Sequence, residues 1–440
     1  MRDDFHRLAD WIAGLLQPRE IFTAYFRGEE SDFVRFGRSR VRQAGSVLQR
    51  SLTLDLIEGA RHATGTVTLA GDPEIDRSRL VELTARLRAA RGESGDDPFL
   101  HYSTDASSIE TAHEQRLPER GYVLSQVERI GRGRDLVGIH ASGSMHAGFA
   151  SSFGQRSWST AHSFHLDWSF HREDGRAAKA SYAGFEWQPD VFERRFEHAR
   201  QSLELLARPP RTITPGGYRV FLTPAALAEI LGLLSWGGFG VKAERTRTTP
   251  LLKMIVDDVR LHPGVTIVEN TGGGIAPAFE ESGFRKPPEV VLVRQGAIAD
   301  RLVSARSARE YGMEPNGAGA SEAPLSVDVA GGDLEDREVL RRLGRGVWIG
   351  NLWYLNFSDR NACRLTGLTR FASFWVEDGE LSAPLATMRF DETIYRMLGA
   401  NLLGLTRERE VIFDPGTYGW RSCESARVPG ALVEDFRFTL

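Results

Sequence analysis

The chain has 440 residues, 41% hydrophobic and 26% charged, which is typical of a soluble globular protein of roughly two to three domains. Its formal net charge of −4 argues against a dedicated nucleic-acid-binding protein, and no apolar run approaches the ~20 residues of a membrane span. Two cysteines and an N-terminus without a signal-peptide pattern indicate a reducing, cytoplasmic environment.

Hydrophobic periodicity predicts that the N-terminal part contains one arrangement twice, a meander of strands followed by a helix. The expected elements are, in order, a helix at 5–16, strands at 21–27, 32–42, 51–57 and 62–69, a helix from Pro73, strands at 133–140, 147–153, 157–170 and 177–187, and a helix from Pro189 to near Leu206. The first pair of strands is expected to turn at Gly28-Glu29-Glu30.

Residues 208–217 form the best linker, because they combine prolines with two glycines. We therefore expect domains at 1–208 and 215–440. The second begins with a strand at 217–221, and Thr223-Pro224 then supplies an N-cap and a first-turn proline for a helix. Many strands with few helices follow, which predicts an α+β fold with mixed or antiparallel sheets and flanking helices.

The C-terminal half contains several short motifs whose order and spacing are informative together. They are Ile275–Gly283, Val290–Gly296, Ser307–Arg309, Asn351–Tyr354, Thr366–Arg370 and Phe374–Glu380, with weaker counterparts at Phe33–Phe36 and 51–69. Together they resemble the TldD/PmbA family, the so-called modulators of DNA gyrase. The resemblance implies a TldD-type zinc peptidase with an HExxxH helix and a cysteine near its C-terminus, and a TldE-type partner that lacks this motif. The charge of the chain gives no support to a nucleic-acid role.

The helix after Thr223 contains Ala228-Glu-Ile-Leu-Gly-Leu233, which occupies the place of the zinc helix. Histidines at the first and sixth positions would supply nitrogen ligands, and the glutamate would polarise the attacking water. Glu229 keeps the glutamate position, but Ala228 and Leu233 cannot bind zinc. We therefore expect no catalytic residue and no metal in this chain, and we expect zinc in a TldD-type partner.

Two further groups carry possible ligands. Cys423 lies where TldD-type subunits place their cysteine ligand, and without two imidazoles we interpret it as a structural residue or a relic. A strand places His165, Asp167, Ser169 and His171 on one face. The two histidines are about 20 Å apart at ~3.3 Å per residue, so we interpret this face as solvent-facing sheet surface. Cys363 is expected to be a packing residue.

Aromatic residues are frequent in the second half of the C-terminal domain. Those that could line a peptide groove are Trp348, Trp353, Tyr354, Phe374 and Trp375. An extended peptide binds by adding a strand to a sheet edge, which suits a strand-rich domain. The alternative interpretation is that these side chains belong to the core.

Three functions follow as hypotheses. The first is a non-catalytic TldE-like subunit that, with a TldD-type zinc subunit, degrades or matures unfolded or precursor peptides as a dimer or higher oligomer. The second is a free-standing, homo-oligomeric peptide-binding or scaffold protein without peptidase activity. The third is a peptidase that uses His165 or Cys423 with a different metal.

Overall fold

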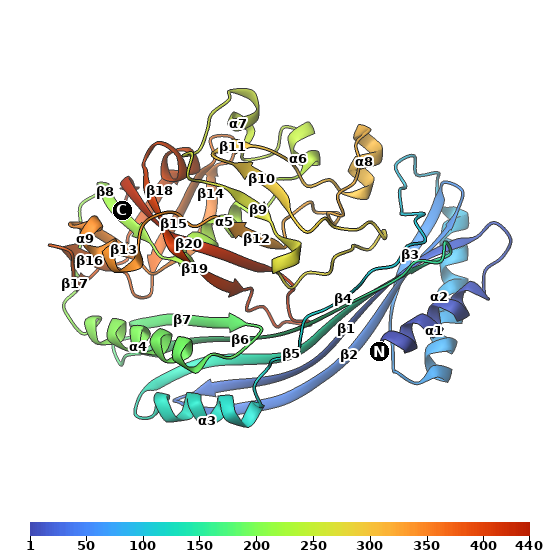
Figure 1. The fold of residues 1–440 in the computed structure, drawn as a ribbon, viewed down its shortest axis with the longest axis horizontal. Helices are drawn as coiled ribbons and strands as arrows, with labels where there is room; N and C mark the ends of the chain where they lie inside the picture. Colours follow the sequence, from blue (N-terminus) through green and yellow to red (C-terminus); the bar gives the residue numbers. More distant parts are fainter.

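The computed structural model describes residues 1–440, which form two β-sheets. A seven-stranded sheet contains the strands between residues 21 and 184, and a thirteen-stranded sheet contains those between 216 and 438. Figure 1 shows the long strands of the first sheet running beneath the second and extending well beyond it. No helix of the structure is both long enough and apolar enough to cross a membrane.

Four of the nine α-helices lie in the first half of the chain, and all four have at least 12 residues. The nine helices are α1 (Arg2–Ala13), α2 (Pro73–Glu93), α3 (Arg120–Gly131), α4 (Pro189–Leu205), α5 (Pro224–Ser235), α6 (Val241–Arg245), α7 (Leu252–Val256), α8 (Ala305–Tyr311) and α9 (Val339–Leu343). The first sheet contains β1 (Ile21–Gly37), β2 (Arg40–Glu58), β3 (Arg61–Thr68), β4 (Glu110–Ala112), β5 (Asp135–Ser151), β6 (Arg156–His171) and β7 (Ala177–Gly184).

The second sheet is built from shorter strands. They are β8 (Gly216–Leu222), β9 (Ile267–Glu269), β10 (Val290–Arg294), β11 (Ala297–Ile298), β12 (Ser326–Val329), β13 (Gly346–Ile349), β14 (Asn351–Asp359), β15 (Arg364–Arg370), β16 (Phe374–Glu377), β17 (Glu380–Pro384), β18 (Arg389–Thr393), β19 (Leu402–Phe413) and β20 (Ser425–Phe438). Both parallel and antiparallel pairs occur, since β8 pairs parallel with β13 and antiparallel with β20. The predicted α+β fold with mixed sheets is confirmed.

The turn predicted at Gly28-Glu29-Glu30 is wrong, because β1 continues through these residues without interruption. Gly28 pairs with a residue of β2 on one side and of β5 on the other, so the sheet holds it extended. The chain reverses instead at Arg38 and Ser39, whose φ angles are 52° and 56°. Two successive positive φ values are those of a type I′ turn, which joins antiparallel strands.

The strands predicted at 133–140 and 147–153 are likewise one strand, β5, which pairs with β6 over nearly its full length. The hairpin predicted for 51–57 and 62–69 is confirmed as the pairing of β2 with β3. A helix that was not predicted, α3, buries Val123 and Val127 against the sheet.

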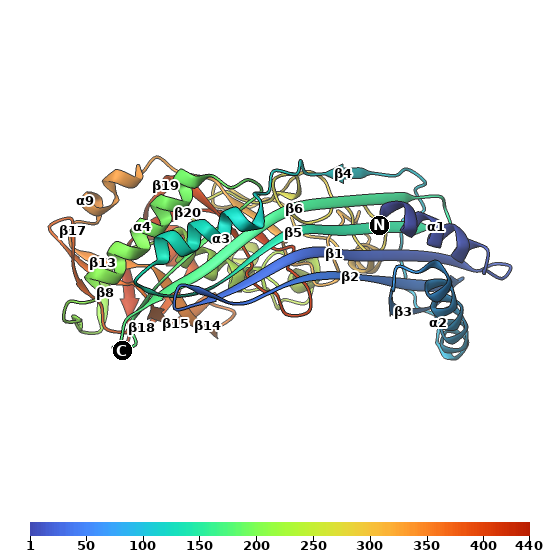
Figure 2. The ribbon, with the colours of Figure 1, turned by 90° about the horizontal axis from the view of Figure 1, so that it is seen from below.

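One face of the first sheet is covered by α1 to α4, and the opposite face carries the C-terminal half of the chain, which contains the second sheet. Leucines of α2 pack with those of β2 on the helical side, and Phe192 and Phe196 of α4 pack against Trp168 of β6. On the other side Phe149 of β5 contacts Phe279 of the C-terminal domain. Figure 2 shows the helical side, with α3 and α4 lying across the long strands. The two halves therefore meet across a broad sheet face.

Candidate functional site

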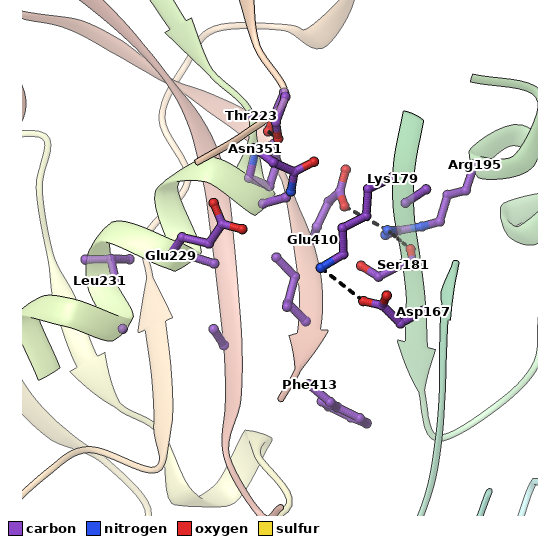
Figure 3. A pocket seen from close by; sticks show the side chains of 18 of the residues that line it. Asp167, Lys179, Ser181, Arg195, Thr223, Glu229, Leu231, Asn351, Glu410 and Phe413 are labelled. Atoms are coloured by element: carbon purple, nitrogen blue, oxygen red, sulfur yellow. Dashed lines mark hydrogen bonds and ion pairs between the residues drawn. The ribbon is translucent and has the colours of Figure 1, made fainter. Parts of the chain in front are cut away.

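A cavity of about 640 Å³ lies between the first sheet and the C-terminal domain. One wall comes from β6, β7 and α4, and the other from α5, the start of β14 and β19. Figure 3 shows Lys179 and Arg195 on the first wall facing Glu229 of α5 across this space. The cavity thus brings together side chains that are distant in the sequence.

Local signals in the sequence place α5. The Thr223 hydroxyl accepts a hydrogen bond from the Ala226 N–H at 3.3 Å and donates one to the Gly350 carbonyl at 2.7 Å. Pro224 occupies the first turn, as predicted. The side chains that anchor the helix in the core are Ala226, Leu227, Ile230, Leu231 and Leu234. Burial of this apolar stripe leaves the other face of α5 toward the cavity.

The three positions compared with a zinc motif lie on and beside that face. Ala228 and Leu233 are both partly buried against the C-terminal core, and Ala228 also lines the cavity. Neither side chain has a lone pair for a metal. Glu229 is the only ionisable residue of α5, and the structure contains no group of three or more His, Cys, Asp or Glu side chains placed to hold a metal ion. The residues of α5 therefore do not fit a zinc ion.

Glu229 instead makes a structural contact. Its Oε2 accepts the backbone N–H of Leu352 at 2.5 Å, which joins α5 to the start of β14. Burial raises the pKa of the Glu229 carboxyl to about 7, although the bond from Leu352 opposes this shift. Near neutral pH the carboxyl is therefore present in both its charged and its neutral form.

Two ion pairs mark the opposite wall. Lys179 of β7 lies 3.4 Å from Asp167 of β6, and burial raises the pKa of Asp167 while Lys179 opposes that rise. Arg195 of α4 donates to the Ser181 carbonyl at 2.9 Å and to Glu410 of β19 at 2.7 Å. The pair of Arg195 with Glu410 connects the two halves of the chain across the cavity.

The five aromatic residues predicted to line a groove are separated by the fold. Trp348 lines the cavity and packs on Phe221, with ring centroids 4.7 Å apart. Trp353 and Tyr354 are 53% and 81% exposed on β14 and do not line the cavity. Phe374 and Trp375 are buried, because β16 lies inside the second sheet between β13 and β17, so their assignment to a groove is corrected to the core.

The prediction that the face with His165 and Asp167 meets solvent is also wrong. The C-terminal domain covers this face, leaving His165 only 4% exposed, and burial lowers the pKa of its imidazole to about 4. Cys423 is partly buried in the same interface, beside a small apolar cluster that includes Phe413. Burial raises the pKa of the Cys423 thiol. Cys363 is buried in the C-terminal core.

The sequence did not indicate that Lys179, Arg195 and Glu410 would line the cavity. Each is a charged residue on an amphipathic element, a pattern that usually means solvent exposure. Asp167 was noticed only through its position on the histidine-containing strand. These residues are brought together by the packing of the two halves of the chain, which is not encoded in any local motif.

We expect Glu229→Gln to change how stability depends on pH. The folded-state pKa is raised from 4.5 to about 7, so the native chain binds more protons at this residue and loses stability as the pH rises through that window. Glutamine keeps an acceptor for the Leu352 N–H without the charge. The variant should match the wild type near pH 4 and exceed its free energy of unfolding by about 3 kcal/mol near pH 8.

Urea unfolding of both proteins across this range checks the prediction. Other buried carboxyl groups titrate in the same window, among them Glu280, whose pKa burial raises to about 7. The difference in the free energy of unfolding between variant and wild type isolates the contribution of Glu229. The charged neighbours that act on its pKa are Lys179, which lowers it, and Asp167, which raises it. A difference that did not change with pH would contradict the assignment.

Comparison with known proteins agrees with the resemblance seen in the motifs. A family model described as "PmbA/TldA metallopeptidase C-terminal domain" matches residues 215–440, slightly more than half of the chain. A comparison with curated proteins finds no match.

Three solved structures share the fold over nearly the whole chain. TldE from Thermococcus kodakarensis has a TM-score of 0.78 at 14% identity, covering 99% of this chain and 100% of that one. A proposed modulator of DNA gyrase from Thermotoga maritima has a TM-score of 0.77 at 13% identity, with 99% and 100% covered. One from Bacteroides thetaiotaomicron has a TM-score of 0.75 at 12% identity, with 99% of each chain covered.

Proposed function

This chain belongs to the PmbA/TldD metallopeptidase family, and on that premise we propose that it is a TldE-like, non-catalytic subunit of a TldD/TldE-type zinc peptidase. Its role is to bind unfolded or precursor peptides in the cavity between its two halves and to assemble with a zinc-bearing TldD-type subunit that cleaves them. No residue of this chain takes part in the cleavage itself, and no cofactor is held by it.

The observation that carries the proposal is the combination of α5 with the cavity. A helix in the place of the metal helix presents Ala228 to a space large enough for a peptide, while Glu229 is hydrogen-bonded to Leu352. This supports binding without metal chemistry. Cavities of some 300–1,000 Å³ are typical of ligand sites. Cys423 then has a packing role in the domain interface.

β14 is the proposed contact strand for the peptide. It pairs only with β15, and Gly350 and Asn351 at its start line the cavity beside Trp348. An extended peptide can hydrogen-bond to such a strand while its side chains enter neighbouring pockets.

We expect the chain to form a complex with a TldD-type subunit from the same genome. Permanent interfaces bury upward of ~2,000 Å², so the complex should survive co-purification and gel filtration. Light scattering should give the mass of a dimer or higher oligomer for this chain alone and of a mixed oligomer after co-expression. A 49.0 kDa monomer unaffected by the second subunit would contradict the proposal.

The second candidate is a homo-oligomeric peptide-binding protein that acts without a peptidase partner. It is favoured by the fact that both walls of the cavity come from one chain. Tight binding of peptide by a homo-oligomer, with no affinity for a TldD-type subunit, would support this alternative.

A further inference from the structure

One side of the first sheet ends in a long strand without a neighbour. β2 pairs with β1 along its length, whereas β3 covers its outer side only from Ser51 onward. Residues 40–50 therefore form an open edge, which spans roughly 35 Å at ~3.4 Å per residue. Figure 2 shows β2 at the margin of the sheet, with β3 and α2 at one end only.

The backbone groups that face outward along this edge can be identified. The Leu69 N–H donates to the Arg50 carbonyl at 3.0 Å, so the backbone of Arg50 points away from β1. Strand residues alternate in direction, and the pairing with β1 has no irregularity between Gln43 and Arg50. Leu48, Ser46 and Ala44 consequently present their N–H and C=O groups to solvent in the same direction.

The middle of this edge lacks the usual protection against strand addition. Natural edges are short, charged, bulged, interrupted by proline or covered by another segment. Residues 43–49 contain no proline and no charged residue, their pairing with β1 has no bulge, and Leu48 is 62% exposed. A second cavity of about 260 Å³ adjoins the strand, and its lining includes Val47, Ile139 and Gly419. Some side chains of an added strand would lie next to this second cavity. The second cavity shares no lining residue with the larger cavity between the two halves of the chain.

The edge is also positively charged. Arg35, Arg38, Arg40 and Arg42 have no carboxylate within the 4.0 Å of an ion pair. The neighbouring Asp32 is occupied by Arg120, at 2.7 Å. Four unneutralised guanidinium groups at one end of an open strand favour an acidic ligand.

We propose that the open edge of β2 is a docking site for an extended, acidic segment of another protein, which adds to the first sheet as an eighth strand. The site goes beyond the proposed function, because it lies outside the cavity between the domains. Nucleic acid could neutralise the same arginines, but its phosphates would leave the N–H and C=O groups of Ala44, Ser46 and Leu48 without strand partners. A peptide satisfies both features.

The test uses a fluorescein-labelled peptide of about eleven residues with alternating glutamate and valine, and its lysine counterpart. Fluorescence anisotropy should show that the full chain binds the acidic peptide with a dissociation constant at least about tenfold lower than that of the basic peptide. Ala44→Pro removes one outward N–H and should weaken binding by at least about tenfold. Ala44→Thr keeps that N–H and should bind within about twofold of the wild type.

A triple variant, Arg38→Glu with Arg40→Glu and Arg42→Glu, tests the charge without touching the backbone. The triple variant should bind the lysine peptide more tightly than the acidic one. If circular dichroism shows that Ala44→Pro does not fold, the triple variant alone tests the docking site. Equal binding of both peptides by the triple variant and the wild type would overturn the proposal. So would a single-stranded oligonucleotide that binds more tightly than the acidic peptide and is insensitive to Ala44→Pro.

Discussion

Arg421→Leu is expected to lower the free energy of unfolding by about 3–5 kcal/mol, because it removes a buried guanidinium together with its hydrogen bonds and its attraction to the buried Glu29 carboxylate. Arg421 is 2% exposed and comes from the segment between β19 and β20, which reaches the first sheet. Its guanidinium donates to the Ser163 hydroxyl at 2.7 Å and to the Ser163 carbonyl at 3.0 Å. Glu29, 1% exposed, is the charge that supports the arginine most strongly.

Chemical unfolding of variant and wild type measures this loss. Arg427→Leu is the matched control, since that arginine is exposed and makes no ion pair, and it should change stability by no more than about 0.5 kcal/mol. Adding Glu29→Gln to Arg421→Leu should recover part of the loss by removing the unpaired charge. A loss no larger than that of the control would show that Arg421 does not hold the two halves together.

Ala228→Trp is expected to weaken peptide binding in the cavity between the two halves of the chain. The methyl group of Ala228 lines this space, and an indole there would fill the volume that a peptide side chain needs. We expect the dissociation constant for an unstructured peptide to rise by at least about tenfold, or ~1.4 kcal/mol. Because Ala228 also packs against the C-terminal core, circular dichroism should first show that the variant is folded.

Isothermal titration with the same peptide checks this result. Val81→Trp is the control, because Val81 is 47% exposed on α2 and lies outside the cavity. It adds the same bulk and should leave the affinity unchanged. Unchanged affinity in Ala228→Trp would place the peptide elsewhere, for example on the open edge of β2.

Elements with local signals could be predicted from the sequence. Helix α5 begins at an N-cap threonine followed by proline, and its apolar spacing is that of a helix packed on one side. The hairpin of β2 and β3 has an equally clear alternation. In contrast, α3 was not predicted, although Val123 and Val127 are buried at i, i+4 spacing.

The length of β1 could not be predicted, since Gly28 followed by two charged residues interrupts the apolar pattern of the strand. Pairing with strands on both sides keeps these residues extended, and this stabilisation arises only in the assembled sheet. Two side chains were misassigned for a similar reason. His165 is buried by the packing of one half of the chain on the other, and Phe374 is buried because its strand lies inside a sheet. The alternation of polar and apolar residues does not reveal either contact.

We propose that this chain contributes binding and assembly to a peptidase whose zinc lies in another subunit. The most direct measurement is the rate of peptide cleavage by the purified chain, by a zinc-loaded TldD-type subunit, and by their mixture, with the zinc content of each determined after dialysis. We predict well under one zinc per molecule and no cleavage for this chain alone, and cleavage by the mixture that is faster than by the zinc subunit alone. The account would be contradicted if the chain alone retained one tightly bound metal and cleaved peptide, and if Cys423→Ser or His165→Ala removed both properties.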